Sequence, residues 1–148
     1  MSDAVDIRPA ALEDQESLFE LHRTVFRSHI EEIWGWDEKW QRSQFRREFE
    51  SSVTSVVQVA GRTVGYVQTV VSANLLYLRN IALHPDVQGQ GIGTCLVTRL
   101  QQEAVERGVP VNLSLFRTNP RSINFYERLG FRRTGETDAY IKMSWRPA

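Results

Sequence analysis

The segment best suited to chemistry lies mid-chain, where an apolar run passes through a glycine-rich turn into a helical pattern. It reads Gln88-Gly89-Gln90-Gly91-Ile92-Gly93-Thr94. The first turn of a helix leaves backbone N–H groups unpaired and carries a partial positive charge, and glycines let an anion approach them closely. The turn therefore predicts a phosphate or pyrophosphate site built mainly from main-chain N–H groups. The alternative is a glycine turn that serves only tight packing between strand and helix.

Two other glycine-rich phosphate loops do not fit this spacing. A P-loop requires Gly-Lys-Ser/Thr, but Gly93 is followed by Thr94 and Cys95. A dinucleotide-binding fingerprint that began at Gly89 would have Thr94 in place of its third glycine. No βαβ unit with a suitably spaced acidic residue follows it. The segment therefore matches neither loop.

A second motif follows downstream, and the two together resemble one family. The downstream motif is formed by Asn119, Ser122, Phe125, Tyr126, Gly130 and Phe131. Residues 88–93 fit the Gln/Arg-x-x-Gly-x-Gly/Ala signature of the GNAT superfamily of acyl-CoA-dependent N-acetyltransferases, and residues 119–131 resemble its later motif. The order of strands and helices also agrees, so the resemblance covers nearly the whole chain. It implies transfer of an acetyl group from acetyl-CoA to a primary amine, of a small molecule or of a protein, by direct attack in a ternary complex.

The resemblance also implies which residues hold the cosubstrate. In this family acetyl-CoA lies between two splayed parallel strands, here residues 75–83 and 111–116, with the pyrophosphate on the glycine-rich turn. The residues implied to contact acetyl-CoA are Ile81, Leu83, Gln88, Gly89, Gln90, Gly91, Ile92, Gly93, Thr94, Asn119, Ser122 and Tyr126. Asn119 is equally suited to cap the helix that begins at Pro120, and both functions can coexist. Ser122 stands where the family commonly has alanine, so a cosubstrate contact from its hydroxyl is a weaker expectation.

Tyr126 matches the family's tyrosine that acts as general acid toward the departing thiolate. A phenol with a pKa near 10 can protonate a thiolate only if the site tunes the pair. The alternative is an aromatic side chain on the buried face of the helix, next to Phe125. Because Tyr126 belongs to the downstream motif, the interpretation as a general acid is favoured.

The general base is the least determined part of the site. An amine arrives protonated and must lose a proton, yet residues 75–83 lack the glutamate that many relatives carry there. Glu31 and Glu32 are the favoured candidates, because acidic residues among Trp34, Trp36 and Trp40 could form an amine-binding wall. The alternative is an aromatic core built by these tryptophans. A water held by Asn80 and the imidazole of His84 are further candidates, while His22 and His29 are expected at exposed helix positions.

The composition bounds the rest. The chain has 148 residues, which favours one N-acetyltransferase domain over residues 1–148. Residues 1–50 carry 7 basic and 12 acidic side chains, a balance of −5, and residues 51–148 carry 11 and 6, a balance of +5. With a net charge of zero, nucleic acid binding is not expected. The sequence has no long apolar run, so we do not expect a membrane span. We expect a cytoplasmic protein. One cysteine and three scattered histidines predict no metal site.

The hydrophobic pattern predicts strands and helices of a mixed α/β domain, and the resemblance implies that they form a central, mostly antiparallel sheet with one splayed parallel strand pair and flanking helices. Strands are expected near 5–8, 53–60, 63–71, 75–83, 111–116, 131–135 and 139–145. Helices are expected at 12–26, within 28–49 in two pieces broken at Gly35, and at 91–107 and 120–129. Gly61-Arg62 is expected as the two-residue turn of a hairpin.

Two other functions stay open. The missing strand glutamate suits a noncatalytic acyl-CoA-binding or sensor module. A nucleotide-binding protein unrelated to CoA would have to bind ATP or NAD at least as well as CoA. The acidic, aromatic segment 31–40 tilts the expected acceptor toward a small cationic amine, and exposed tryptophans would favour a homodimer surface.

Overall fold

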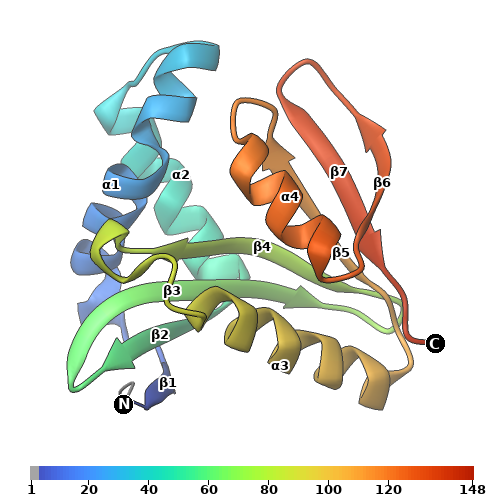
Figure 1. The fold of residues 1–148 in the computed structure, drawn as a ribbon. Helices are drawn as coiled ribbons and strands as arrows, with labels where there is room; N and C mark the ends of the chain where they lie inside the picture. Colours follow the sequence, from blue (N-terminus) through green and yellow to red (C-terminus); the bar gives the residue numbers. More distant parts are fainter. Residues whose placement is uncertain (1–3) are drawn as a thin grey trace.

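Seven strands form one sheet in the order β1-β2-β3-β4-β5-β7-β6 (Figure 1). The computed structural model describes residues 4–148. The strands are β1 (Val5–Pro9), β2 (Val53–Val59), β3 (Arg62–Val71), β4 (Leu76–Leu83), β5 (Val111–Phe116), β6 (Arg132–Glu136) and β7 (Tyr140–Trp145). Neighbouring strands are antiparallel except for the parallel pair β4–β5. The predicted fold class, a mostly antiparallel sheet with one parallel pair, is confirmed.

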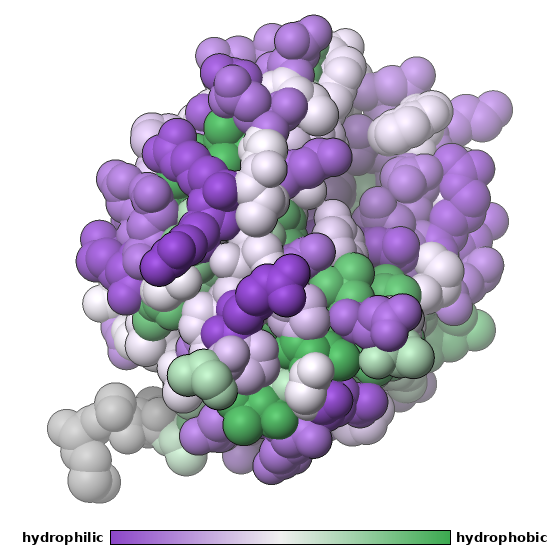
Figure 2. Space-filling model, turned by 90° about the vertical axis from the view of Figure 1, so that its right-hand side faces the viewer, coloured by the Kyte–Doolittle hydropathy of each residue, from purple (hydrophilic) through white to green (hydrophobic). Residues whose placement is uncertain are grey.

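Four helices and two short 3-10 turns complete the described chain. They are η1 (Leu12–Asp14), α1 (Gln15–Trp34), α2 (Glu38–Ser51), η2 (Pro85–Val87), α3 (Ile92–Arg107) and α4 (Pro120–Arg128). No helix within residues 4–148 has the length and apolar character needed to cross a membrane. The side of the molecule that carries β6 and β7 is mostly hydrophilic in its upper part, with hydrophobic side chains gathered toward its lower part (Figure 2).

The helices pack on opposite faces of the sheet. Successive strand residues point to opposite faces, so Val56 joins the core under α1 and α2, while Val57 joins the core under α3 and α4. On β3, Tyr66 likewise joins the core under α1 and α2, and Val67 joins the core under α3 and α4. Each face of the central strands is therefore buried, which explains the nearly continuous apolar sequence of β4.

The parallel pair separates after three residues. Leu76, Tyr77 and Leu78 pair with Val111, Asn112 and Leu113, and the pairing ends there. On its other edge, β4 carries an irregularity at the same point, because Leu78 faces Thr69 and Asn80 faces Gln68, which leaves Arg79 as an extra residue. An extra residue of this kind bends a strand and increases its twist. The bulge at Arg79 therefore accompanies the divergence of β4 from β5.

Most predicted elements are confirmed, with two corrections. The helix predicted for 12–26 continues to Trp34 and ends at Gly35, whose φ of +82° breaks it from α2 as expected. The hairpin turn is Ala60-Gly61 rather than Gly61-Arg62. Both residues have positive φ, 51° and 76°, and Arg62 already pairs with Val59. A turn with positive φ at both central positions matches the twist of the flanking strands, which explains the one-residue displacement.

Candidate functional site

A cavity of about 880 Å³ lies between the helices α1 and α2 and the separated ends of β4 and β5. From the strands and α4 it is lined by Tyr77, Leu78, Arg79, Asn80, Ile81, Leu113, Ser114, Leu115, Phe116, Asn119, Ser122, Tyr126 and Tyr140. From α1, α2 and the turn between them it is lined by His22, Phe26, Ile30, Trp34, Gly35, Asp37, Trp40, Gln41, Gln44, Phe45 and Glu48. The splay predicted from the resemblance therefore opens into a chamber walled by the first two helices.

The glycine-rich turn lies outside this cavity, at the start of α3. Gly89 and Gly91 have φ of +77° and +83°, a backbone conformation that side chains with a Cβ rarely adopt. The first helical bond of α3 runs from the Cys95 N–H to the Gly91 carbonyl, 3.1 Å. Helix geometry therefore leaves the N–H groups of residues 92–94 free of intrahelical partners at an exposed turn. This arrangement fits a bound pyrophosphate.

Three side chains of the turn, those of Gln88, Gln90 and Ile92, have structural contacts, and the Gln90 amide donates to the Asp86 carbonyl at 3.3 Å. The Gln88 side-chain amide donates to the Leu83 carbonyl, 3.0 Å, and so ties the turn to the end of β4. A Cβ added at Gly93 would lie 3.3 Å from Cζ of Phe125, which shows how closely α3 approaches α4 there. Ile92 is buried in the core. Tight packing and an anion site thus coexist in this segment.

The residues implied to hold acetyl-CoA fall into two groups. Ile81, Asn119, Ser122 and Tyr126 line the cavity. Leu83, the last residue of β4, and residues 88–94, which form the turn and the start of α3, lie outside its lining. Asn119 also caps α4, because its side-chain oxygen accepts from the Ser122 N–H at 3.3 Å. Its cap is confirmed, and a contact to CoA stays a prediction.

Tyr126 is buried where α4 faces the cavity. Its ring packs edge-on against Phe125 and Phe131, with centroids 5.0 and 5.3 Å away. Burial raises the pKa of its phenol above the usual value of 10. The hydroxyl is therefore protonated at neutral pH, as a proton donor must be. The interpretation of Tyr126 as an aromatic on the buried face of the helix is confirmed, and its function as general acid stays a prediction.

Glu31 and Glu32 do not reach the cavity. Ile30 and Trp34 occupy the inward face of α1, so the residues directly after Ile30 turn toward solvent. Glu31 instead accepts from the guanidinium of Arg27, 2.6 Å, one turn earlier on the exposed face. His84 also lies outside the lining, where its Nδ1 accepts from the Asp86 N–H at 3.1 Å. Trp34 and Trp40 do line the cavity, but Trp36 does not.

Two carboxylates line the cavity, and the one that contacts the strands is Glu48 of α2. Its Oε2 accepts from the side-chain amide of Asn80 on β4, 3.4 Å, and its Oε1 from that of Gln44, 3.2 Å. Sequence reasoning missed this residue. The signal that could have found it is its spacing, because Gln41, Phe45 and Glu48 recur at helical intervals and so share one face of the helix. Phe45 is apolar and buried, which shows that this face points inward and carries Glu48 with it.

The expectation that His22 and His29 are exposed is wrong. His22 is half-buried among Phe19, Phe26, Trp36 and Phe45, and its Nε2 lies 3.2 Å from Oε1 of Gln41. Desolvation lowers the pKa of His22, which favours the neutral ring. His29 is also half-buried, with its Nδ1 2.7 Å from the hydroxyl oxygen of Thr118. The apolar face of α1 is thus wider than its pattern of leucines indicated.

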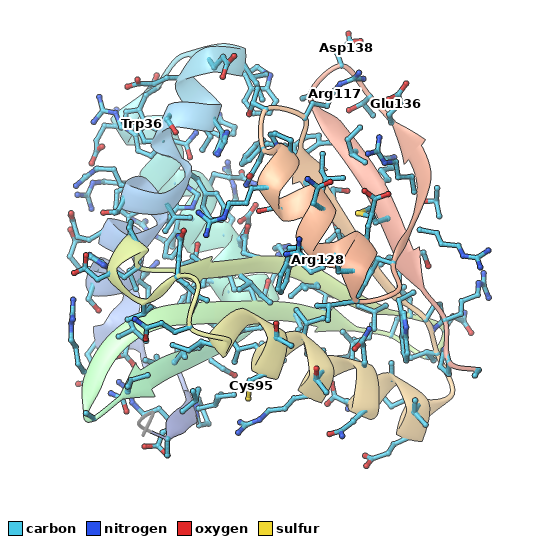
Figure 3. All side chains as sticks on the ribbon, in the orientation of Figure 1. Trp36, Cys95, Arg117, Arg128, Glu136 and Asp138 are labelled. Carbon is cyan, nitrogen blue, oxygen red and sulfur yellow. The ribbon has the colours of Figure 1, made fainter. Side chains whose placement is uncertain are left out.

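Two further features bear on other chemistry. Cys95 projects from α3 on the side away from α4 and does not line the cavity (Figure 3). Within residues 4–148, no group of three or more His, Cys, Asp or Glu side chains is placed to hold a metal ion.

Comparison with known proteins places the chain in a family. Residues 15–131 match the model of the acetyltransferase (GNAT) family. A protein described as an uncharacterized N-acetyltransferase of Methanocaldococcus jannaschii is 26% identical over 147 residues, covering 93% of this chain and 65% of its own length. An acetyltransferase of Sodalis glossinidius is 32% identical over 77 residues, covering 51% of this chain and 54% of its own. The chain thus spans less than two thirds of the length of either relative.

The fold has solved counterparts as well. The crystal structure of the PaiA N-acetyltransferase of Thermoplasma acidophilum in complex with coenzyme A superposes with a TM-score of 0.79 at 19% identity. The superposition covers 97% of this chain and 99% of that one. Acetyltransferases of the GNAT family use acetyl-CoA. Since the family model matches most of the chain and the fold agrees, this protein belongs to the acetyltransferase (GNAT) family.

Proposed function

We propose that the protein is an N-acetyltransferase that transfers the acetyl group of acetyl-CoA to a primary amine by direct attack in a ternary complex, with residues 1–148 acting as one domain. The observation that supports this best is a single cavity. It joins the separated ends of β4 and β5, where Tyr126 lies, to a chamber that holds a carboxylate and several aromatic rings. One ligand entering from the α3 turn and a second entering between α1 and α2 would meet beside Tyr126.

The residues present fit acetyl-CoA. The turn at Gly89 and Gly91 offers free N–H groups to the pyrophosphate, and the strand splay leaves room for the pantetheine arm. Beyond Leu78, the edge of β4 that faces β5 has no strand partner among the described residues, so its main chain is free to bond the arm and the acetyl carbonyl. Main-chain donors at that carbonyl stabilise the negative charge that develops on its oxygen during attack.

Once the amine has lost its ammonium proton, the reaction requires two proton movements. Acetyl-CoA supplies an activated thioester, in which the C–S bond breaks as the amine nitrogen bonds to the carbonyl carbon. Tyr126 donates its proton to the departing sulfur, for which a protonated phenol is required. A base on the acceptor side takes a proton from the nitrogen. Afterwards the tyrosine regains a proton from solvent.

A test is CoA-thiol release by the purified full chain with acetyl-CoA and a panel of primary amines, including a peptide with a free α-amino group. The reaction without amine is the background control, and mass spectrometry identifies the acetylated product. Amine-dependent thiol release with an N-acetylated product supports the proposal. Acetyl-CoA binding without amine-dependent release from any member of the panel contradicts it and favours a noncatalytic acyl-CoA-binding module.

A further inference from the structure

The acceptor side of the cavity contains an acid that forms no ion pair among residues 4–148. Glu48 is half-buried, and both groups that hold it, the amides of Gln44 and Asn80, are neutral. No ion pair among residues 4–148 involves Glu48, although other acids of α1 and α2, such as Glu16, Glu31 and Glu38, are paired with arginines. The amide of Asn80 is itself fixed, since it also donates to Gln68 at 2.8 Å. The carboxylate is therefore held in place with its charge available to a ligand.

Three aromatic rings from three different elements form a wall of the same cavity. Phe116 and Tyr140 stack with ring centroids 5.5 Å apart and an interplanar angle of 24°. Trp34 meets Phe116 edge-on at 6.2 Å and lies 5.9 Å from Tyr140. Trp34 is 57% exposed despite these contacts, so its ring also faces open space. Such surfaces bind apolar groups and, through their ring faces, ammonium ions.

The charges of the cavity limit how cationic its ligand can be. Arg79 also lines it, and its guanidinium donates to the hydroxyls of Ser51 and Ser52 at 2.9 and 2.7 Å. Asp37, the other acid of the lining, is exposed and caps the start of α2, eleven residues before Glu48, which is about 16 Å along the helix axis at 1.5 Å per residue. Besides Asp37 at its far end, the lining therefore combines one carboxylate, Glu48, with one guanidinium, Arg79. This balance disfavours a polycation.

We propose that Glu48 binds the ammonium group of the acceptor and takes its proton, and that the acceptor is a monocationic primary amine with an aromatic or aliphatic body lying on Trp34, Phe116 and Tyr140. This inference rests on the proposed acetyl transfer. The bound ammonium first gives one proton to Glu48, which passes it to solvent, and this frees the lone pair of the nitrogen for attack. The nitrogen becomes much more acidic as it bonds to the carbonyl carbon, so Glu48 accepts a second N–H proton while the C–N bond forms and the C–S bond breaks. The proton of Tyr126 goes to the sulfur, and Glu48 releases its own to solvent.

In this proposal, Glu48 has the function that the family resemblance implies for a glutamate on the first splayed strand. Here that strand contributes Asn80, which donates to Glu48 instead of supplying the base itself. The carboxylate thus comes from α2 and reaches the strand through one hydrogen bond. Asn80 is a positioning residue in this arrangement.

The test compares Glu48→Gln with Glu50→Gln, an exposed acid on the same helix that does not line the cavity. The acceptors are phenethylamine, phenylalanine, spermidine and a tetrapeptide with a free α-amino group. We expect the native chain to prefer phenethylamine by at least about tenfold in kcat/KM. We expect Glu48→Gln to lower kcat/KM for phenethylamine by about 100-fold or more, and Glu50→Gln to leave it unchanged. Acetyl-CoA affinity and thermal unfolding should be the same in both variants.

The possible failures are distinguishable. If the native chain acetylates amines but Glu48→Gln keeps kcat/KM within about threefold of it, the inference is wrong and the proposed function stands. A preference of the native chain for phenylalanine, spermidine or the tetrapeptide also overturns the inference, and this measurement does not depend on whether the variant folds. If the native chain acetylates none of the amines, the proposed function itself fails.

Discussion

The Nδ1 atom of His29 lies 2.7 Å from the hydroxyl oxygen of Thr118, although the two residues are 89 positions apart. The imidazole also stacks on Phe116, with centroids 5.7 Å apart and an interplanar angle of 17°. His29 belongs to the last part of α1, and Thr118 to the segment between β5 and α4. These contacts connect the helical side of the cavity to its sheet side and hold Trp34 close to Phe116 and Tyr140.

Replacing Thr118 by valine removes this hydrogen bond and keeps the shape of the side chain. A hydrogen bond of this kind contributes about 1 kcal/mol, so a less firmly held chamber should raise the acceptor KM about fivefold. kcat should change little, because Thr118 does not line the cavity. Steady-state kinetics with saturating acetyl-CoA measure the effect, with Thr118→Ser as the control that keeps the hydroxyl. Equal KM values for the valine and serine variants would show that the contact does not shape the acceptor site.

Tyr126→Phe tests the proton donor. The substitution keeps the packing against Phe125 and Phe131 and removes only the hydroxyl. We expect kcat to fall by about 100-fold or more, the usual contribution of a positioned general acid, with unchanged calorimetric affinity for CoA. A variant that keeps most of its kcat would assign Tyr126 to the core alone.

Gly65→Ala tests how the end of β4 is held. A Cβ at Gly65 would lie 2.4 Å from the Ala82 carbonyl oxygen and 2.7 Å from Cδ2 of Leu83, so the paired strands must shift. Overpacking of this kind costs about 1–3 kcal/mol. The free energy of unfolding in urea should fall by that amount. In the control Gly135→Ala, the contact with Lys142 is 4.0 Å and little change is expected. Equal stability of the two variants would contradict the close approach of β3 to β4.

The contribution of Glu38, which lies where α2 follows α1, to the stability of the fold should decrease at low pH. Hydrogen bonds from Trp36 and from Arg23 lower the pKa of Glu38 from 4.5 to about 2. Because the pKa is lower in the folded protein, the ionised group stabilises the fold above about pH 4.5, and this contribution disappears as the pH falls toward 2. The difference in urea midpoint between the native chain and Glu38→Gln should therefore shrink from pH 6 to pH 2. A difference that stays constant with pH would contradict these contacts.

Much of the fold could be predicted from the sequence because its signals are local. Gly35 and Gly108 end helices with positive φ, Asn119 and Pro120 begin one, and β-branched residues mark the strands. The observed hairpin turn lies one residue before the predicted one, because an alanine, Ala60, adopts the positive φ that glycine usually takes. Here pairing of Arg62 with Val59 outweighed the local preference.

The acceptor side of the site could not be predicted as well, because it depends on which face of each helix meets the sheet. Glu31 and Glu32 stand among tryptophans in the sequence, yet they follow the inward residue Ile30 and turn outward. Glu48 lies in a stretch of mostly polar residues, and only the packing of α2 against the sheet brings it to Asn80. The glycine-rich turn, by contrast, is contiguous in sequence and was visible there.

The most direct test of the central claim is calorimetric titration of the full chain with acetyl-CoA, with ATP and NAD as controls, in the native protein, Gly91→Glu and Gly108→Glu. Gly91 and Gly108 flank α3 with φ of +83° and +68°, and no atom lies within 4 Å of a Cβ added at either. The two variants thus introduce similar backbone strain and the same charge at opposite helix ends. We predict selective micromolar binding of acetyl-CoA that is lost in Gly91→Glu and retained in Gly108→Glu. Binding of ATP or NAD at least as tight as that of acetyl-CoA, or undiminished acetyl-CoA binding by folded Gly91→Glu, would contradict the account.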